Sequence, residues 1–176
     1  MKKVSMISLG LLLAAAQVNA AAASDGTITF NGELDSQTCT VSVNGGDSSN
    51  SVTLPKVSTS LLQTAGQTAG STRFTIGLSE CSTQTGEVYA YFEQGASVNA
   101  NGRLNNTGTA TNVDLQLLDS EENPLNAGST DQSTSPVTAT LNAGAATLSY
   151  AAQYFATAAA TAGTVASSVT YSINYL

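Results

Sequence analysis

The last residues of the chain alternate strictly between large apolar and small polar side chains. The apolar positions are Val169, Tyr171, Ile173 and Tyr175. Successive side chains of a β-strand point to opposite faces of the sheet, so this period of two predicts a half-buried strand that runs to the end of the sequence. We therefore expect a fold built from β-strands.

Shorter runs of the same kind recur along the rest of the sequence. β-Branched and aromatic residues gather in stretches separated by Gly, Asn, Asp and Ser, as in strands joined by turns. The expected strands are residues 27–34, 38–43, 51–54, 73–78, 87–92, 112–118, 136–141, 146–155 and 165–175. Many short strands within 176 residues, about the length of one domain, favour an all-β sandwich over a barrel or a helical fold.

Turn and breaker residues separate these strands. Asn44-Gly45 and Asn101-Gly102 are the strongest turn signals, because both residue types tolerate a positive φ. The Ala-rich residues 156–162 have helix propensity, but Thr157 and Thr161 interrupt them and the stretch is too short to hold alone. We expect a loop there.

The composition excludes several classes of function. The chain has no His, two Cys, 5 Lys plus Arg and 12 Asp plus Glu. Without His there is no Ser-His-Asp or Cys-His relay, and the usual nitrogen ligands of metal ions are missing. The acidic balance argues against nucleic acid as a partner, because that affinity rests on cations that neutralise phosphates. We expect no enzymatic activity, no metal and no cofactor.

Close carboxylates offer the one catalytic alternative, a glycosidase pair. Glu80, Glu87 and Glu93 are one candidate source of such a pair, and the adjacent Glu121 and Glu122 are another. Glu121 and Glu122 precede Asn123-Pro124, a turn signal, where exposed acids are common. Solvated surface charge is the better interpretation.

The first twenty residues have the three parts of a secretory signal peptide. Lys2 and Lys3 precede a mostly apolar stretch at residues 6–16, and residues 18–20 (VNA) supply the small residues of a cleavage site. A membrane anchor is the alternative, but the apolar run is shorter than the roughly 20 residues that span a bilayer. Cleavage after Ala20 is preferred over cleavage after Ala22 or Ala23, and any of the three leaves three cations and twelve acids, a net charge of 3 − 12 = −9.

Export determines how the two cysteines are interpreted. Disulfides persist in oxidising compartments, so Cys39 and Cys81 are expected to form one intrachain bridge. Two buried free thiols are the alternative. A loop of this size stabilises a fold by roughly 4 kcal/mol in the chain-entropy model.

The start of the mature chain also alternates, with Gly26, Ile28 and Phe30 on one face. By itself this stretch could be an ordinary first strand. Several segments, however, match a known family in order: residues 26–33 (GTITFNGE), 39–41 (CTV), 78–81 (LSEC), 110–119 (ATNVDLQLLD) and 154–158 (YFATA), with Gly163 fourteen residues from the end and a penultimate Tyr175. The chain resembles the chaperone-usher pilus subunits, in particular the major rod subunit of type 1 fimbriae.

The resemblance implies an incomplete immunoglobulin-like β-sandwich, the pilin fold, which lacks its last strand. It divides the chain into a signal peptide (1–20), an N-terminal extension that acts as donor strand (21–34) and a pilin domain (35–176). Gly26, Ile28 and Phe30 are the expected donor residues, with Gly26 setting the register. The expected edge of the acceptor groove, where a chaperone also binds, consists of Gly163, Val169, Tyr171, Ile173 and Tyr175.

The implied function is that of the major structural subunit of a fimbria, exported through the periplasm to the bacterial cell surface. Copies polymerise head-to-tail by donor-strand exchange into a rod used in cell adhesion. The implied partners are further copies, a periplasmic chaperone, an outer-membrane usher and other pilus subunits. A minor or adaptor subunit of the same system is one alternative. A monomeric secreted β-sandwich that binds carbohydrate is another, although the chain has no Trp for an aromatic platform.

Overall fold

The computed structural model describes residues 39–134 and 136–176. Contacts group Asp35–Leu176 into one compact unit. The predicted signal peptide, the N-terminal extension with Gly26, Ile28 and Phe30, and the expected strand at residues 27–34 lie outside the described residues.

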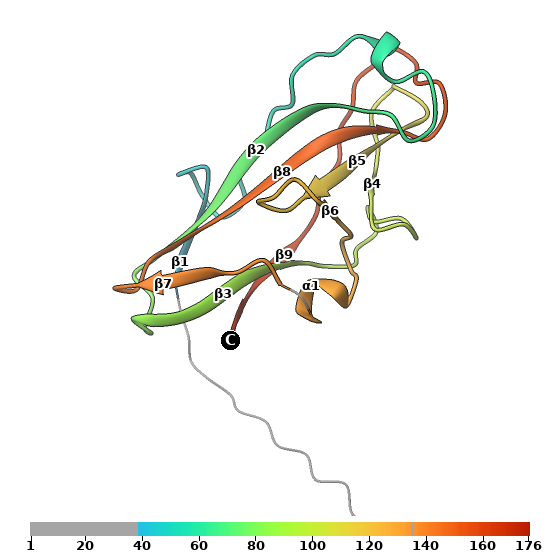
Figure 1. Ribbon diagram of the computed structural model, residues 1–176. Helices are drawn as coiled ribbons and strands as arrows, with labels where there is room; N and C mark the ends of the chain where they lie inside the picture. Colours follow the sequence, from blue (N-terminus) through green and yellow to red (C-terminus); the bar gives the residue numbers. More distant parts are fainter. Residues whose placement is uncertain (1–38, 135) are drawn as a thin grey trace, which may run out of the picture. The chain divides into compact units, whose positions relative to one another are not determined.

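One sheet contains six strands in the order β1-β2-β8-β5-β4, with β6 paired to β5 (Figure 1). Its members are β1 (Thr40–Val43), β2 (Thr68–Ser79), β4 (Leu104–Asn105), β5 (Val113–Leu118), β6 (Pro124–Leu125) and β8 (Ala146–Ala156). All of its ladders are antiparallel. The long pair β2 and β8 shifts register between Ala69 and Thr72, where Gly70 has a φ of +68°. A side chain at Gly70 would press on the ring of Tyr154, so this bulge needs glycine.

The second sheet has three strands in the order β7-β3-β9. They are β3 (Thr85–Phe92), β7 (Ala139–Asn142) and β9 (Tyr171–Tyr175), and both ladders are antiparallel. In Figure 1 this sheet faces the long strands β2 and β8. The predicted all-β sandwich is therefore confirmed.

Aromatic side chains from both sheets meet in the core. Phe92 of β3 lies edge-on to Tyr150 of β8 and to Phe74 of β2, with ring centroids 5.0 and 6.4 Å away. Such pairs contribute about 0.5–1.5 kcal/mol each beyond the area they bury. Alternation in β2, with Phe74, Ile76 and Leu78 all buried, directs this apolar face inward.

Where β3 extends beyond its partner strand β7, side chains supply the hydrogen bonds of its main chain. β7 pairs only with residues 85–88, so the far half of β3 has no strand on that side. The Ala90 N–H donates to the Tyr150 hydroxyl (3.1 Å). At the end of β3, the Phe92 N–H donates to Gln132 Oε1 (2.9 Å), and Gln132 Nε2 donates back to the Phe92 carbonyl (3.0 Å). Gln132 lies in the single-turn helix α1 (Asp131–Thr134) and is 8% exposed, so it replaces a missing strand at a buried edge.

Most expected strands are present with shifted ends. Residues 38–43, 73–78, 87–92, 112–118, 136–141 and 146–155 correspond to β1, β2, β3, β5, β7 and β8. The Ala-rich stretch after β8 is a loop, as predicted. The two-residue strands β4 and β6, α1, and the 3₁₀ turn η1 (Thr59–Leu61) were not predicted, because elements this short carry no periodic signal.

Two strand predictions are wrong in part or whole. Residues 51–54 form no strand, and residues 165–170 are also unassigned, so the final strand shortens to β9. Both segments still alternate in exposure: Val52 and Leu54 are half-buried between exposed neighbours, as are Val165 and Val169. In the described part of the chain, residues 51–54 and 165–170 lack the complete set of backbone hydrogen bonds to neighbouring strands that would define them as strands.

Cys39 and Cys81, the pair expected to bridge, are joined by a disulfide with a sequence separation of 42. The bridge links the residue before β1 to the turn after β2. In the chain-entropy model it contributes about 4 kcal/mol by restricting the unfolded chain. It therefore anchors the start of the described chain to the body of the sandwich.

We predict that Gln132→Ala lowers the free energy of unfolding by about 1–3 kcal/mol, because it leaves the buried N–H of Phe92 without its partner, while the Phe92 carbonyl still accepts from the Gly128 N–H (2.8 Å). Chemical denaturation of the oxidised protein measures the change. The exposed Gln63→Ala is the matched control and should change stability by no more than about 0.5 kcal/mol. Equal effects of the two substitutions would contradict the bracing role of Gln132.

Candidate functional site

Two segments face each other across one side of the sandwich without pairing. We call residues 163–175 the C-terminal rim and residues 51–57 the opposite rim; together they form the open edge. Val52 and Leu54 of the opposite rim, and Val169, Tyr171 and Ile173 of the C-terminal rim, are partly buried against the same core cluster. No backbone hydrogen bond joins the two rims within the described residues.

The main-chain hydrogen bonds of the C-terminal rim lie along one of its two sides. The backbone groups with partners outside β9 belong to even-numbered residues. They are the carbonyls of Thr164, Ala166 and Thr170, the N–H groups of Thr164 and Ala166, and the N–H of Leu176. Neighbouring residues of a strand direct their main-chain groups to opposite sides. The odd-numbered residues 165–175 therefore point their N–H and C=O groups toward the open edge, and their side chains toward the core.

Gly163 allows the beginning of this rim to lie against the loop of residues 106–110. A Cβ at Gly163 would collide with the backbone of Ala110. The Ala110 N–H donates to the Thr164 carbonyl (3.0 Å), and the Thr107 N–H donates to the Ala166 carbonyl (2.8 Å). Gly163 is itself exposed, so it shapes the rim through its backbone and not by packing into the core.

Two tyrosine hydroxyls of the C-terminal rim reach the first segment of the described chain. The Tyr171 hydroxyl donates to the Ser48 carbonyl (2.8 Å), and the Tyr175 hydroxyl lies 3.1 Å from Cys39 Sγ. Burial raises the pKa of both tyrosines above the ordinary value. These contacts tie β9 to the region around β1, while its other main-chain edge has no partner among residues 39–134 and 136–176.

Ser167 lies in the middle of the C-terminal rim, between Val165 and Val169. Its hydroxyl is buried and has no hydrogen-bond partner among the described residues. Buried hydroxyls in folded proteins nearly always have a partner, because leaving one unpaired costs free energy. The unsatisfied group indicates that the core is incomplete at this point of the open edge.

An apolar pocket of about 280 Å³ lies at the end of the open edge where the C-terminal rim begins. Val57, Leu62, Val113, Ala160, Gly163 and Val165 are among its lining residues, and Lys56 stands beside them. A second cluster of buried residues packs beneath it, including Leu62, Val113 and Ala160. The pocket suits an apolar side chain.

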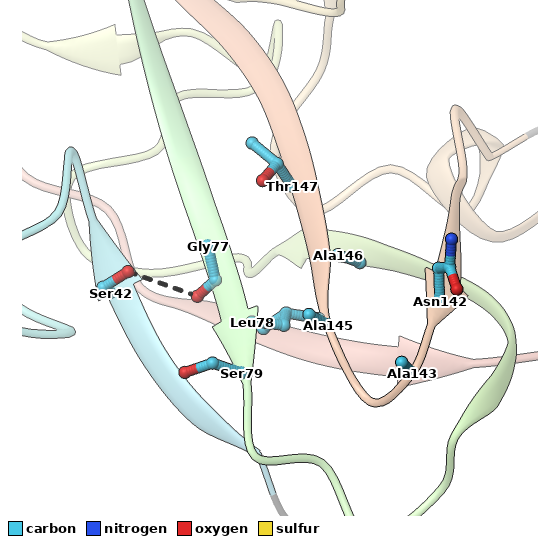
Figure 2. A pocket seen from close by; sticks show the side chains of 9 residues that line it. All are labelled: Ser42, Gly77, Leu78, Ser79, Asn142, Ala143, Ala145, Ala146 and Thr147. Atoms are coloured by element: carbon cyan, nitrogen blue, oxygen red, sulfur yellow. Dashed lines mark hydrogen bonds between the residues drawn. The ribbon is translucent and has the colours of Figure 1, made fainter.

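A wider and shallower hollow of about 540 Å³ lies elsewhere, over the ends of β1, β2 and β8 (Figure 2). Ser42, Gly77, Ser79, Asn142 and Thr147 are among its lining residues, and Ser42 donates to the Gly77 carbonyl. Its lining contains no titratable side chain, so it provides neither an acid–base pair nor metal ligands.

Other potential sites are limited in the described part of the chain. Among residues 39–134 and 136–176, no group of three His, Cys, Asp or Glu side chains is placed to hold a metal ion. No helix within those ranges is both long and apolar enough to cross a membrane.

The groove residues expected from the family resemblance lie on one side of the open edge, and the other side was not predicted. Gly163, Val169, Tyr171, Ile173 and Tyr175 all lie on the C-terminal rim. The contribution of Val52 and Leu54 was not anticipated, although their alternation with Ser51 and Thr53 was visible and was assigned to an ordinary strand. The pocket around Val57 gave no sequence signal, because its lining comes from distant segments.

Comparison with known proteins identifies the family. Residues 54–176 match the family described as "FimA: Type-1 fimbrial protein, A". The chain belongs to the type-1 fimbrial protein family. It is 49% identical over 156 residues to "Major fimbrial subunit SMF-1" of Stenotrophomonas maltophilia (strain K279a), covering 84% of this chain and 89% of the relative. It is also 43% identical over 166 residues to "F17 fimbrial protein" of Escherichia coli, covering 89% of each chain.

The fold agrees with this family. "Crystal structure of the P pilus rod subunit PapA" superimposes with a TM-score of 0.59 over 78% of this chain and 99% of that chain, at 20% identity. The predicted pilin fold is confirmed, and the chain is a structural subunit of a surface fimbrium.

We predict that this fimbrial subunit loses stability as the pH rises above about 10, the ordinary pKa of tyrosine. Burial raises the pKa of Tyr171 and Tyr175, so the folded state holds these protons more tightly than the unfolded state. The resulting stabilisation is complete below the unfolded pKa and is lost as the pH rises through the folded one. Denaturation between about pH 8 and pH 11 measures it.

The double substitution Tyr171→Phe/Tyr175→Phe is the comparison. It should flatten the alkaline fall without removing it, because burial also raises the pKa of Tyr150 and Tyr154. An unchanged alkaline slope in the double variant would show that the two rim tyrosines titrate alike in the folded and unfolded states.

Proposed function

We propose that this chain is the major subunit of a chaperone-usher fimbria and that it polymerises by donor-strand exchange. The N-terminal extension of one copy, residues 21–34, inserts into the open edge of the next copy. The single observation that carries the proposal is the main-chain edge of residues 165–175, which has no pairing partner in the described part of the chain and is lined by half-buried apolar side chains.

The extension suits this edge in length and pattern. Gly26, Ile28 and Phe30 share one face by alternation, and Gly32 and Leu34 continue it. A strand added to an open edge gains main-chain hydrogen bonds and places alternate side chains in pockets; chaperone–pilin complementation is an established example of this mode. Burying Ile28 and Phe30 contributes about 1.5–3 kcal/mol each before the cost of ordering the extension.

Head-to-tail insertion generates a filament because the contact does not close on itself. The same edge must be covered before assembly, since an exposed apolar sheet edge pairs with other chains. A periplasmic chaperone that lends a strand, and an outer-membrane usher that exchanges it, complete the proposed route. The subunit acts through its assembled rod in adhesion and has no catalytic activity of its own.

The name of the relative from S. maltophilia, a major subunit, favours the rod role over a minor or adaptor role. A monomeric carbohydrate-binding sandwich is less compatible with these observations. Its sheet edges would be paired or covered, whereas the open edge here leaves main-chain groups and the Ser167 hydroxyl without partners among the described residues.

We predict that a synthetic peptide of residues 21–34 binds the mature full-length subunit and converts self-associated material into a 1:1 complex. At a peptide concentration 100 times its Kd, binding adds about 2.7 kcal/mol of stability, or a Tm increase of about 5–10 °C. Size-exclusion chromatography and thermal unfolding measure the two effects. A stable monomer that ignores the peptide would exclude donor-strand exchange and favour the carbohydrate-binding alternative.

We further predict that Gly26→Leu reduces fibre yield by at least about fivefold, because overfilling a close-packed site costs about 1–3 kcal/mol. The periplasmic complex with the chaperone should remain, since the acceptor edge of the variant is intact. Thr27→Leu, on the opposite face, is the matched control and should assemble normally. Electron microscopy counts the fibres. Normal fibres from Gly26→Leu would refute the assigned register but would not contradict donor-strand exchange.

A further inference from the structure

Lys56 is the one cation without an acidic partner in the part of the chain that the structure describes. Arg73 pairs with Glu122 at 2.7 Å, and Arg103 pairs with Asp114 at 3.1 Å while its guanidinium lies 4.0 Å from the centroid of the Phe155 ring. Lys56 is exposed and makes no ion pair. In a mature chain with a net charge of −9, an unpaired cation at a docking edge is a specific electrostatic feature.

Lys56 lies where an inserted strand would end. It stands on the opposite rim beside Val57, at the margin of the 280 Å³ apolar pocket where the C-terminal rim begins. Any strand inserted along the open edge must end close to it. One residue of that strand fills the pocket. The residues directly before and after it therefore lie next to the Lys56 ammonium group.

The apolar pocket determines which end of the extension lies there. The inward face of the extension runs from Gly26 to Leu34, and of these two end residues only Leu34 has a side chain that fills an apolar pocket. This places Leu34 at the Val57 end and Gly26 at the Tyr175 end, so the extension runs antiparallel to the C-terminal rim. Every ladder in the described sheets is likewise antiparallel.

Leu34 is flanked by two acids, Glu33 and Asp35, whose side chains point outward when Leu34 points inward. We propose that Lys56 pairs with this Glu33/Asp35 couple of the neighbouring copy and so selects the direction and register of the inserted strand. The inference rests on donor-strand exchange as the proposed function. It adds a charge contact at the rim of the interface, which mainly affects the rate and specificity of association.

Zero-length crosslinking of assembled fibres tests the contact. A carbodiimide activates a carboxylate, and a neighbouring amine displaces the urea to leave an amide. Lys56 is the only lysine of the mature chain, so its products can be assigned without ambiguity. We expect a ladder of covalent multimers on denaturing gels, and mass spectrometry of chymotryptic peptides should join Lys56 to Glu33 or Asp35.

Lys56→Arg is the matched control, because guanidinium keeps the charge but does not form the amide. Its fibres should assemble normally and give no Lys56-dependent ladder. A link from Lys56 to Asp25 would overturn the proposed direction, and wild-type fibres without any Lys56 link between copies would overturn the contact. Failure of the wild-type chain to form any fibre would instead refute the proposed function.

A charge exchange tests whether the contact selects the partner. Lys56→Glu should slow incorporation by roughly two- to tenfold, the range expected when an exposed ion pair becomes a repulsion. Combining it with Glu33→Lys and Asp35→Lys in the same chain should restore most of the rate. A combined variant no faster than Lys56→Glu alone would overturn the pairing.

Discussion

Hydrogen bonding of the main chain at sheet edges is the constraint on which this structure depends. A strand that packs apolar side chains against a core must also find partners for its N–H and C=O groups, and a missing partner costs free energy. The sandwich meets this requirement in two ways. Where β3 outruns β7, Tyr150 and Gln132 supply side-chain partners from the same chain. At the open edge, no described residue supplies a partner for the outward main-chain groups of the odd-numbered residues 165–175.

The two edges have different roles: the edge of β3 contributes to the stability of the subunit, and the open edge to its function. The edge of β3 is closed by residues of the described unit, so it contributes to a subunit that keeps its own shape. The open edge joins an unpaired main chain, half-buried Val, Ile and Tyr side chains, and the unsatisfied hydroxyl of Ser167. A surface with these properties is a binding site for another strand, because only a strand satisfies the main chain and the apolar positions together.

Charge adds selectivity to an interaction that backbone pairing alone leaves unspecific. Main-chain hydrogen bonds are the same for every sequence and in every register, whereas side-chain pockets and charges are not. The apolar pocket near Val57 distinguishes Leu34 from glycine, and the neighbouring Lys56 distinguishes acids from cations. Two of the three mature cations are engaged within the subunit, which leaves Lys56 available for a partner.

The sequence by itself determined the all-β class, most of the strands and the Cys39–Cys81 pairing, because period-two alternation and export are local properties of a sequence. The expected groove residues came from the family resemblance and not from alternation. The two failed strand predictions, at residues 51–54 and 165–170, have one physical cause: alternation reports a half-buried extended segment, not whether another strand lies beside it. Only the tertiary structure decided that these segments face each other unpaired. It also decided that Val57, Val113 and Gly163 meet at one pocket beside Lys56, since that arrangement depends on the packing of segments distant in sequence.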